Sequence, residues 1–93
     1  MGDAFEIVYD ALVVREDLLG LDRSVLLNIK RTIEDKLLTN PEYYGKPLRG
    51  ALHGYWSLRV GEYRIAYHFA SNVVHVDVIK HRSVIYETLR SRI

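Results

Sequence analysis

The chain has 93 residues, 48% of them apolar and 27% charged, with a net charge of +1 and no cysteine. This length supports one hydrophobic core, so we expect a single domain over residues 1–93. Without cysteine, a disulfide framework, a thiolate nucleophile and a cysteine metal site are excluded. The N-terminus has no signal-peptide pattern and no apolar run is long enough for a membrane span, which together predict a cytoplasmic protein.

Charge is distributed unevenly along the chain. Residues 1–45 carry nine acidic and five basic side chains, whereas residues 46–93 carry three acidic and eight basic side chains and all four histidines. A basic second half indicates an anionic partner. Nucleic acid is the first candidate, and an acidic protein segment would satisfy the same electrostatics.

The first half predicts one strand and two helices. Residues 5–9 alternate in the manner of a short strand, which we place inside the sheet. Asp10 is placed to cap a helix that ends near Gly20, with residues 15–17 facing solvent. The apolar residues expected to face the core of this helix are Ala11, Val14, Leu18 and Leu21.

A second helix follows, with Asp22 or Ser24 as its N-cap, and it ends at Asn40-Pro41. Its core-facing stripe consists of Leu26, Ile29, Ile33 and Leu37. Residues 41–50 then predict a loop in which basic and aromatic residues interleave. The loop can be a nucleic-acid contact through Lys46 and Arg49, or a surface connection whose tyrosines cover the helix end.

Residues 55–69 predict a β-hairpin with Val60-Gly61 as its two-residue loop and Arg59 opposite Glu62. Alternation then defines two faces. The core face carries Trp56, Leu58, Tyr63, Ile65, Tyr67 and Phe69. The polar face carries Tyr55, Ser57, Arg59, Glu62, Arg64, Ala66 and His68.

Ser71-Asn72 predicts a tight turn before a last strand over residues 73–79. The strand is expected to place Val74, Val76 and Val78 on the core face, and Val73, His75, Asp77 and Ile79 on the polar face. A cationic cluster, Lys80-His81-Arg82, and a short helix over residues 84–90 follow. We therefore expect an α+β two-layer domain, with two N-terminal helices on a mostly antiparallel four-stranded sheet and a short C-terminal helix.

These residues resemble a known family. Residues 45–50 (GKPLRG), 56–67 (WSLRVGEYRIAY) and 81–86 (HRSVIY) are similar to the RelE/ParE toxins of bacterial and archaeal toxin–antitoxin pairs. The resemblance covers nearly the whole chain. It implies a toxin neutralised by an antitoxin that wraps a helical segment around it, in a toxin–antitoxin hetero-oligomer. RelE-type members cut mRNA in the ribosomal A site and ParE-type members poison DNA gyrase, so the shared fold leaves both targets open.

The RelE pattern, carried over to this chain, implies a catalytic group made of Arg64, His81, Arg82 and Tyr86. Arg64 matches the arginine that stabilises the transition state, and Tyr86 matches the C-terminal tyrosine that stacks on a base or assists proton transfer. A second cationic position falls on Lys80 or Arg82. The remaining expected RNA contacts are Lys46, Arg49, Tyr55, Ser57, Arg59, His68 and His75. In some RelE proteins, the positions of Tyr55 and Ser57 hold a pair of lysines.

Metal-free RNA cleavage by the neighbouring 2′-hydroxyl needs a base, cations that stabilise the charged phosphoryl oxygens, and an acid. Arginine and lysine supply the cations, and His81 is our first choice of proton-transfer group, ahead of His68 and His75. No cofactor or metal is expected, because His75 and Asp77 alone make a poor ligand set. The hypotheses that remain are a ribosome-dependent mRNA endoribonuclease, a non-catalytic gyrase inhibitor, and an inactive interaction module bound by its antitoxin.

Overall fold

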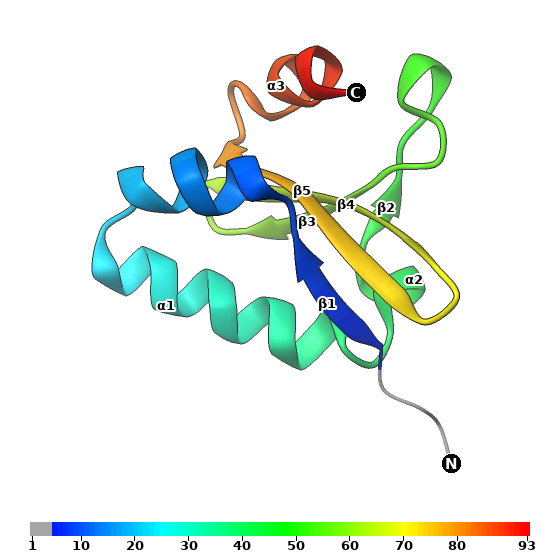
Figure 1. Ribbon diagram of the computed structural model, residues 1–93, viewed down its shortest axis with the longest axis horizontal. Helices are drawn as coiled ribbons and strands as arrows, with labels where there is room; N and C mark the ends of the chain where they lie inside the picture. The colour runs from blue at the N-terminus through cyan, green and yellow to red at the C-terminus, as the bar shows by residue number, and fades with distance from the viewer. Residues whose placement is uncertain (1–4) are drawn as a thin grey trace.

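Five strands form one mixed sheet in the order β1-β5-β4-β3-β2 (Figure 1). The structure is a computed structural model and describes residues 5–93. The strands are β1 (Glu6–Tyr9), β2 (Lys46–Pro47), β3 (Trp56–Val60), β4 (Tyr63–Ala70) and β5 (Val73–His81). Among these five strands, β1 and β5 pair in parallel, and the other three pairs that the structure describes are antiparallel.

The α+β class and the mostly antiparallel pairing are confirmed, but the strand count is wrong. β2 is a fifth strand of two residues inside the segment predicted to be a loop. Such a short strand has no alternation to detect, and its Pro47 is acceptable because β2 lies at the edge of the sheet. β1 occupies the opposite edge rather than the interior that we predicted.

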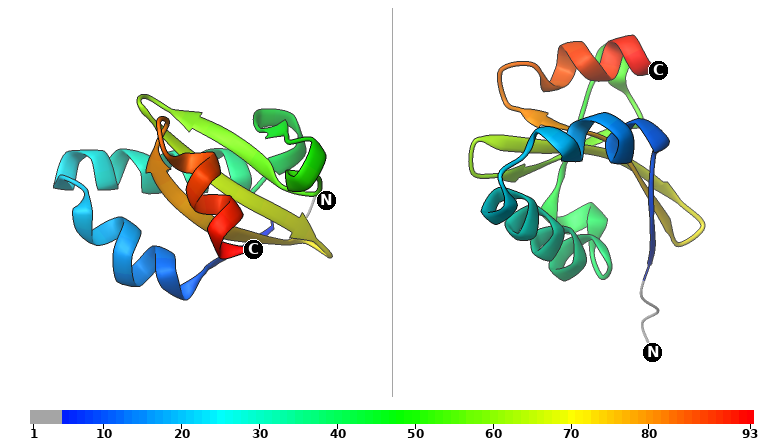
Figure 2. Two further views of the ribbon diagram at one scale, coloured as in Figure 1. Left: turned by 90° about the horizontal axis from the view of Figure 1, so that it is seen from above. Right: turned by 60° about the vertical axis from the view of Figure 1, so that its left-hand side comes forward.

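Helices cover both faces of the sheet, which corrects the two-layer prediction. On one face lie η1 (Val13–Asp17), η2 (Leu18–Gly20) and α1 (Arg23–Thr32), which continues as η3 (Ile33–Leu37). The C-terminal helix α3 (Ile85–Arg92) lies on the other face (Figure 2). Two short helices, α2 (Pro41–Tyr44) and η4 (Gly50–Leu52), occupy the connection between η3 and β3. No helix within residues 5–93 has the length and apolar character needed to span a membrane.

The two faces carry separate hydrophobic cores. The larger core joins η1, α1 and η3 to the sheet and contains Val13, Ile29, Ile33, Leu37, Leu58, Val60, Ile65, Tyr67, Val74, Val76 and Ile79. The smaller core lies beneath α3 and contains Leu52, Ala66, Val78, Ile85 and Leu89. The face that we predicted to be polar is therefore partly covered by α3, and only its two ends remain accessible.

The first helical segment confirms half of its predicted core-facing set: Leu18 and Leu21 pack against the larger core, whereas Ala11 and Val14 are exposed. Asp10 caps it as expected, since its carboxylate accepts a hydrogen bond from the Leu12 N–H at 2.9 Å. However, Val14 is 54% exposed, whereas Val13 is fully buried and Asp17 is 3% exposed. The spacing of apolar residues mispredicted Val14 because the segment turns the Asp17 carboxylate inward. A carboxylate is buried in this way only when it is paired.

The hairpin turn lies one residue later than predicted, at Gly61-Glu62, with Val60 opposite Tyr63. Gly61 has a φ of +60°, which glycine adopts without a Cβ clash. Because both strands shift by one residue, the side chains keep their predicted faces, and that assignment is confirmed. The Ser71-Asn72 turn is also confirmed, with φ values of 52° and 64°.

A β-bulge at Asp77 changes the face of the last residues in β5. Ala66 is opposite Val78, but Tyr67 is opposite Val76, so Asp77 is an extra residue without a partner on β4. Val78 therefore joins the core beneath α3, and Ile79 joins the larger core. Both predictions for these two residues are wrong, because strict alternation over 73–79 cannot include a bulge.

Gly45 is a sensitive position in the larger core. A Cβ on Gly45 would lie 1.8 Å from the hydroxyl oxygen of Tyr67, a fully buried residue whose hydroxyl donates to the Pro41 carbonyl at 2.5 Å. We expect Gly45→Ala to lower the free energy of unfolding by about 1–3 kcal/mol through overpacking. Urea denaturation measures this effect. Gly20→Ala is the matched control, because nothing lies within 4 Å of its added Cβ.

Candidate functional site

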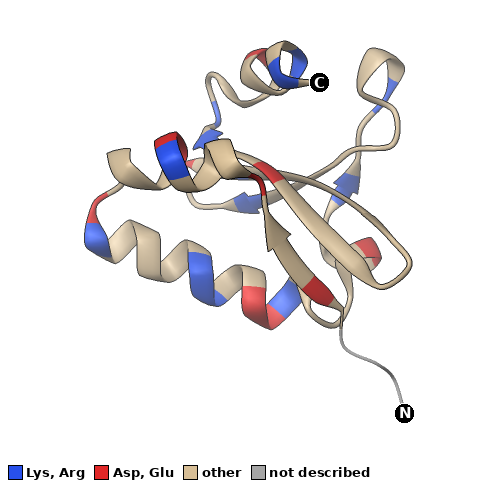
Figure 3. Cartoon of the chain, viewed as in Figure 1, with Lys and Arg blue, Asp and Glu red and all other residues tan. Residues whose placement is uncertain are grey.

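Three cations lie side by side across the face that α3 partly covers. Arg59 on β3 is directly opposite Arg64 on β4, and Arg64 is directly opposite Lys80 on β5. We call these residues the cationic row. Like charges at opposite positions destabilise a sheet, so the row favours an anionic partner. Figure 3 shows basic residues over β2, β3 and the end of β5, whereas the acidic residues lie mainly on the N-terminal elements.

Within residues 5–93, two members of the row, Arg59 and Arg64, form no ion pair with a carboxylate. The Arg64 guanidinium donates from Nη1 to the carbonyls of Gly61 and Tyr63, both at 3.0 Å. Arg59 is exposed and forms no ion pair in this part of the chain. Lys80 has a carboxylate partner, since its Nζ lies 3.2 Å from Oδ1 of Asp17. Arginine suits phosphate because its guanidinium offers two parallel donors.

Tyr86, Ser57 and Lys46 lie next to the row. The first turn of α3 carries Tyr86, which is 37% exposed and whose hydroxyl donates to Ser57 Oγ at 3.4 Å. Ser57 is opposite Lys46 on β2, and Lys46 is exposed. The structure therefore places an aromatic ring and a fourth cation beside the three of the row.

His81 and Arg82 lie apart from the row, around the hairpin turn. His81 is opposite Tyr63, and the two rings meet edge to face at 5.8 Å. The Arg82 Nε donates to Oε1 of Glu62 at 2.9 Å, and this bond holds the pKa of Glu62 below its usual value. The predicted group of Arg64, His81, Arg82 and Tyr86 is thus divided, because alternation turns His81 to the opposite face from Lys80.

Tyr55, His68 and His75 form a second cluster on the same face. Nδ1 of His68 lies 2.7 Å from Oδ2 of Asp77, and the rings of His68 and His75 stack at 4.7 Å. The Tyr55 ring meets His68 edge to face at 5.4 Å. Burial raises the pKa of Asp77, although the bond from His68 opposes this. The Ala66–Val78 pair under α3 separates this cluster from the row, so these residues and the row do not form one site.

Arg49, the last predicted RNA contact, is exposed at the start of η4. It belongs to neither the row nor the histidine cluster in the sheet register. The predicted site residues therefore form three groups on the sheet, with Arg49 outside them.

Asp17 is the residue that sequence reasoning missed. Its carboxylate accepts hydrogen bonds from the Ile79 N–H at 2.9 Å and from both Nη atoms of Arg92 at 2.9 and 2.8 Å. Burial opposes ionisation of Asp17, but the bonds from Arg92, Ile79 and Lys80 outweigh it and hold its pKa below the usual value. No local signal identified it, because the spacing of apolar residues placed Val14 rather than Val13 on the core side of this segment.

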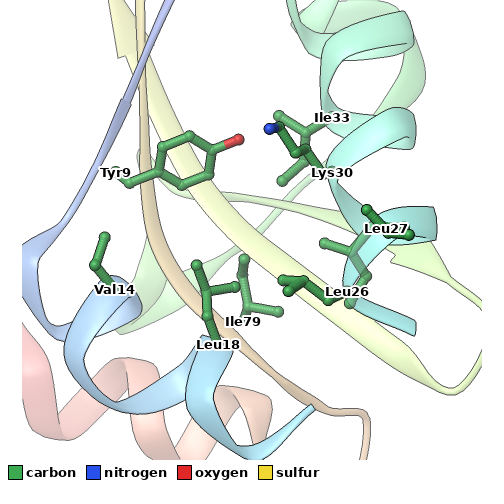
Figure 4. Close-up of a pocket in the computed structure, with 9 residues that line it drawn as sticks. Tyr9, Val14, Leu18, Leu26, Leu27, Lys30, Ile33 and Ile79 are labelled. Carbon is green, nitrogen blue, oxygen red and sulfur yellow. The ribbon is translucent and has the colours of Figure 1, made fainter. Parts of the chain in front are cut away.

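The opposite face has an apolar groove between η1 and α1, with a volume of about 350 Å³ (Figure 4). Val14 and Leu27 line it and are 54% and 46% exposed, and Lys30 is the one charged residue that lines it within residues 5–93. The other lining residues are Tyr9, Leu18, Leu26, Ile29, Ile33 and Ile79. Exposed apolar surface of this kind is typical of protein interaction sites.

No protein-family model and no curated protein matches the chain, but solved structures do. The chain is similar to a structure from the Mycobacterium tuberculosis RelBE2 toxin–antitoxin complex, with a TM-score of 0.81, 27% identity, and coverage of 89% of this chain and 97% of that one. A structure from the Methanococcus jannaschii RelB–RelE antitoxin–toxin complex has a TM-score of 0.68 and 26% identity, and the match covers 87% of this chain and 96% of that one. The isolated Escherichia coli RelE toxin has a TM-score of 0.69 and 21% identity, and the match covers 96% of this chain and 98% of that one.

Proposed function

Because this chain belongs to the RelE-like superfamily of toxins, we propose that in its host cell it acts as a ribosome-dependent mRNA endoribonuclease. The observation that carries the proposal is the cationic row with Tyr86 beside it. Four positive charges and one partly exposed aromatic ring on a rigid sheet suit an RNA phosphate and its adjoining base.

The row supplies electrostatic stabilisation for metal-free cleavage. In this mechanism the 2′-hydroxyl gives up its proton to a base and bonds to the adjacent phosphorus, the bond from phosphorus to the 5′-oxygen breaks, and an acid protonates the leaving 5′-oxygen. The phosphoryl oxygens gain negative charge in the transition state. Arg64 and Lys80 lie on adjacent strands and are our candidates to bind those oxygens. Tyr86 is our candidate to stack on the base or to transfer a proton, because its hydroxyl contacts Ser57 beside the row.

Lys46 compensates for a departure from the RelE pattern. The resemblance implies lysines at the positions of Tyr55 and Ser57, and neither residue carries a positive charge. Lys46 on β2 is directly opposite Ser57, so it brings an ammonium group to the same part of the face. We therefore assign phosphate binding to Lys46 in place of the missing pair.

Cleavage of mRNA on purified ribosomes with an empty A site tests the proposal. Discrete cuts at the A-site codon are the expected result. A folded protein that arrests growth without cutting mRNA would contradict it. The non-catalytic gyrase alternative would then be favoured, because none of the four histidines lies on the cationic row to transfer a proton there. A DNA supercoiling assay would test that alternative.

We also propose that the cellular partner is an antitoxin, as in the complexes to which the chain is similar. The groove between η1 and α1 suits an amphipathic antitoxin helix, with an acidic residue facing Lys30. We expect Leu27→Asp to weaken toxin–antitoxin binding at least tenfold, because it places a charge in the groove. Calorimetry with the purified cognate antitoxin measures this affinity.

Leu19→Asp is the matched control for Leu27→Asp. Leu19 is 78% exposed on η2 and does not line the groove. Equal affinity losses in both variants would argue against the groove as the binding site.

A further inference from the structure

One buried carboxylate connects three separate elements next to the cationic row. Asp17 on η1 has a side chain with 0% exposure. It accepts from the backbone of Ile79 on β5, from both Nη atoms of Arg92 on α3, and from Lys80 on β5. Glu16 also approaches Arg92, at 3.6 Å. A buried carboxylate with this many donors is fixed in place and can fix other groups.

Lys80 needs such a fixed partner. It is opposite Arg64, so repulsion drives the two side chains apart, and a lysine stem has several freely rotating bonds. Asp17 lies 3.2 Å from the Lys80 ammonium and restrains it. Lysine has three N–H donors, so this contact leaves others for a phosphate, and the side chain is 34% exposed.

Asp17 restrains Lys80 without cancelling the charge of the row. The carboxylate carries one negative charge, and Arg92 already pairs with both of its oxygens. The buried group of Asp17, Arg92 and Lys80 therefore carries one net positive charge, and Glu16, whose side chain is 60% exposed, lies near Arg92 rather than near Lys80. Arg92 acts as the counterion of Asp17, and Lys80 remains available to attract an anion.

We propose that Asp17 is a positioning residue for the reaction, which holds the Lys80 ammonium where the substrate phosphate binds. The inference rests on the proposed RNA cleavage. A positioning role differs from a purely structural role because loss of the Asp17 charge should lower kcat without raising KM. Removing the charge of Asp17 keeps every cation in the chain but frees Lys80 to move, and it also takes the carboxylate partner from Arg92.

Three variants of the full chain test the proposal in the ribosome cleavage assay: Asp17→Asn, Lys80→Met and Arg92→Met. We expect Asp17→Asn to lower kcat about tenfold to a hundredfold while KM stays equal or falls, because the protein gains positive charge. Lys80→Met should lower kcat and raise KM together. Arg92→Met disturbs the same buried cluster but preserves the pair between Asp17 and Lys80, so kcat should stay within about threefold of wild type.

The combined variant makes the test specific to Lys80. If Asp17 acts through Lys80, adding Asp17→Asn to Lys80→Met should lower kcat by less than about twofold more. Full additivity in the combined variant would overturn the proposal. So would a wild-type kcat in Asp17→Asn, or equal losses in Asp17→Asn and Arg92→Met.

A measurement on the wild-type protein covers the case in which Asp17→Asn does not fold. In NMR, a Lys80 ammonium held by Asp17 should exchange its protons with water more slowly than the exposed Lys30. Equal exchange rates would overturn the positioning role. Absence of mRNA cleavage by wild-type protein with a slowly exchanging Lys80 would instead refute the proposed function, and of the inference it would leave only the restraint of Lys80 by Asp17.

Discussion

Replacing Arg64 with alanine is expected to lower mRNA cleavage on the ribosome by about a hundredfold or more, with thermal unfolding close to wild type. Arg64 lies at the centre of the cationic row, between Arg59 and Lys80. Within the described residues 5–93, its guanidinium donates only to the carbonyls of Gly61 and Tyr63, so its removal leaves no buried charge unpaired there. Single-turnover cleavage and circular dichroism measure the two effects.

Arg31→Ala is the matched control for Arg64→Ala. Arg31 is exposed on α1, which packs on the opposite face of the sheet, and its loss changes the net charge equally. Equal losses of activity in both variants would point to a general charge effect. Full activity in Arg64→Ala would show that the cationic row is not the site of cleavage.

Replacing Trp56 with alanine is expected to lower the free energy of unfolding by roughly 3 kcal/mol. The indole packs on the rings of Tyr67 and Phe69, with centroids 6.5 and 5.3 Å away. Because Trp56 is only partly buried, we place the cost at the lower end of the range for large aromatic residues. A domain of this size has few kilocalories in reserve, so the variant will be close to unfolding.

Urea denaturation of Trp56→Ala and Tyr43→Ala measures this loss. Tyr43 is 74% exposed and provides an aromatic-to-alanine change outside both cores. Near-equal midpoints for the two variants would mean that Trp56 contributes little to the aromatic cluster.

Alternating hydrophobicity predicted the hairpin well because an error in the turn left the faces unchanged. Moving the loop from Val60-Gly61 to Gly61-Glu62 shifts both strands together, so Arg59 and Arg64 remain on one face. The same rule failed in β5, where one extra residue at Asp77 reversed the assignments of Val78 and Ile79. A bulge depends on pairing with β4 and has no signature within β5 itself.

The site was predictable where it depends on strand register and unpredictable where it depends on tertiary contacts. Arg64 and Lys80 were both expected on the basis of resemblance, and the register brings them together. Asp17 was expected in solvent because an acidic residue usually lies there. Its burial depends on Arg92, which is 75 residues away in the sequence. Local patterns contain no information about that pairing.

The parallel pairing of β1 with β5 also sets the order in which the chain can fold. Among the strands within residues 5–93, β1 comes first in the sequence and pairs only with β5, the last of them. During synthesis, the first half can form its helices but cannot complete the sheet edge until residues 73–76 have been made. The cationic row is likewise incomplete until Lys80 follows, so a nascent chain acquires this surface only after β5 has been made.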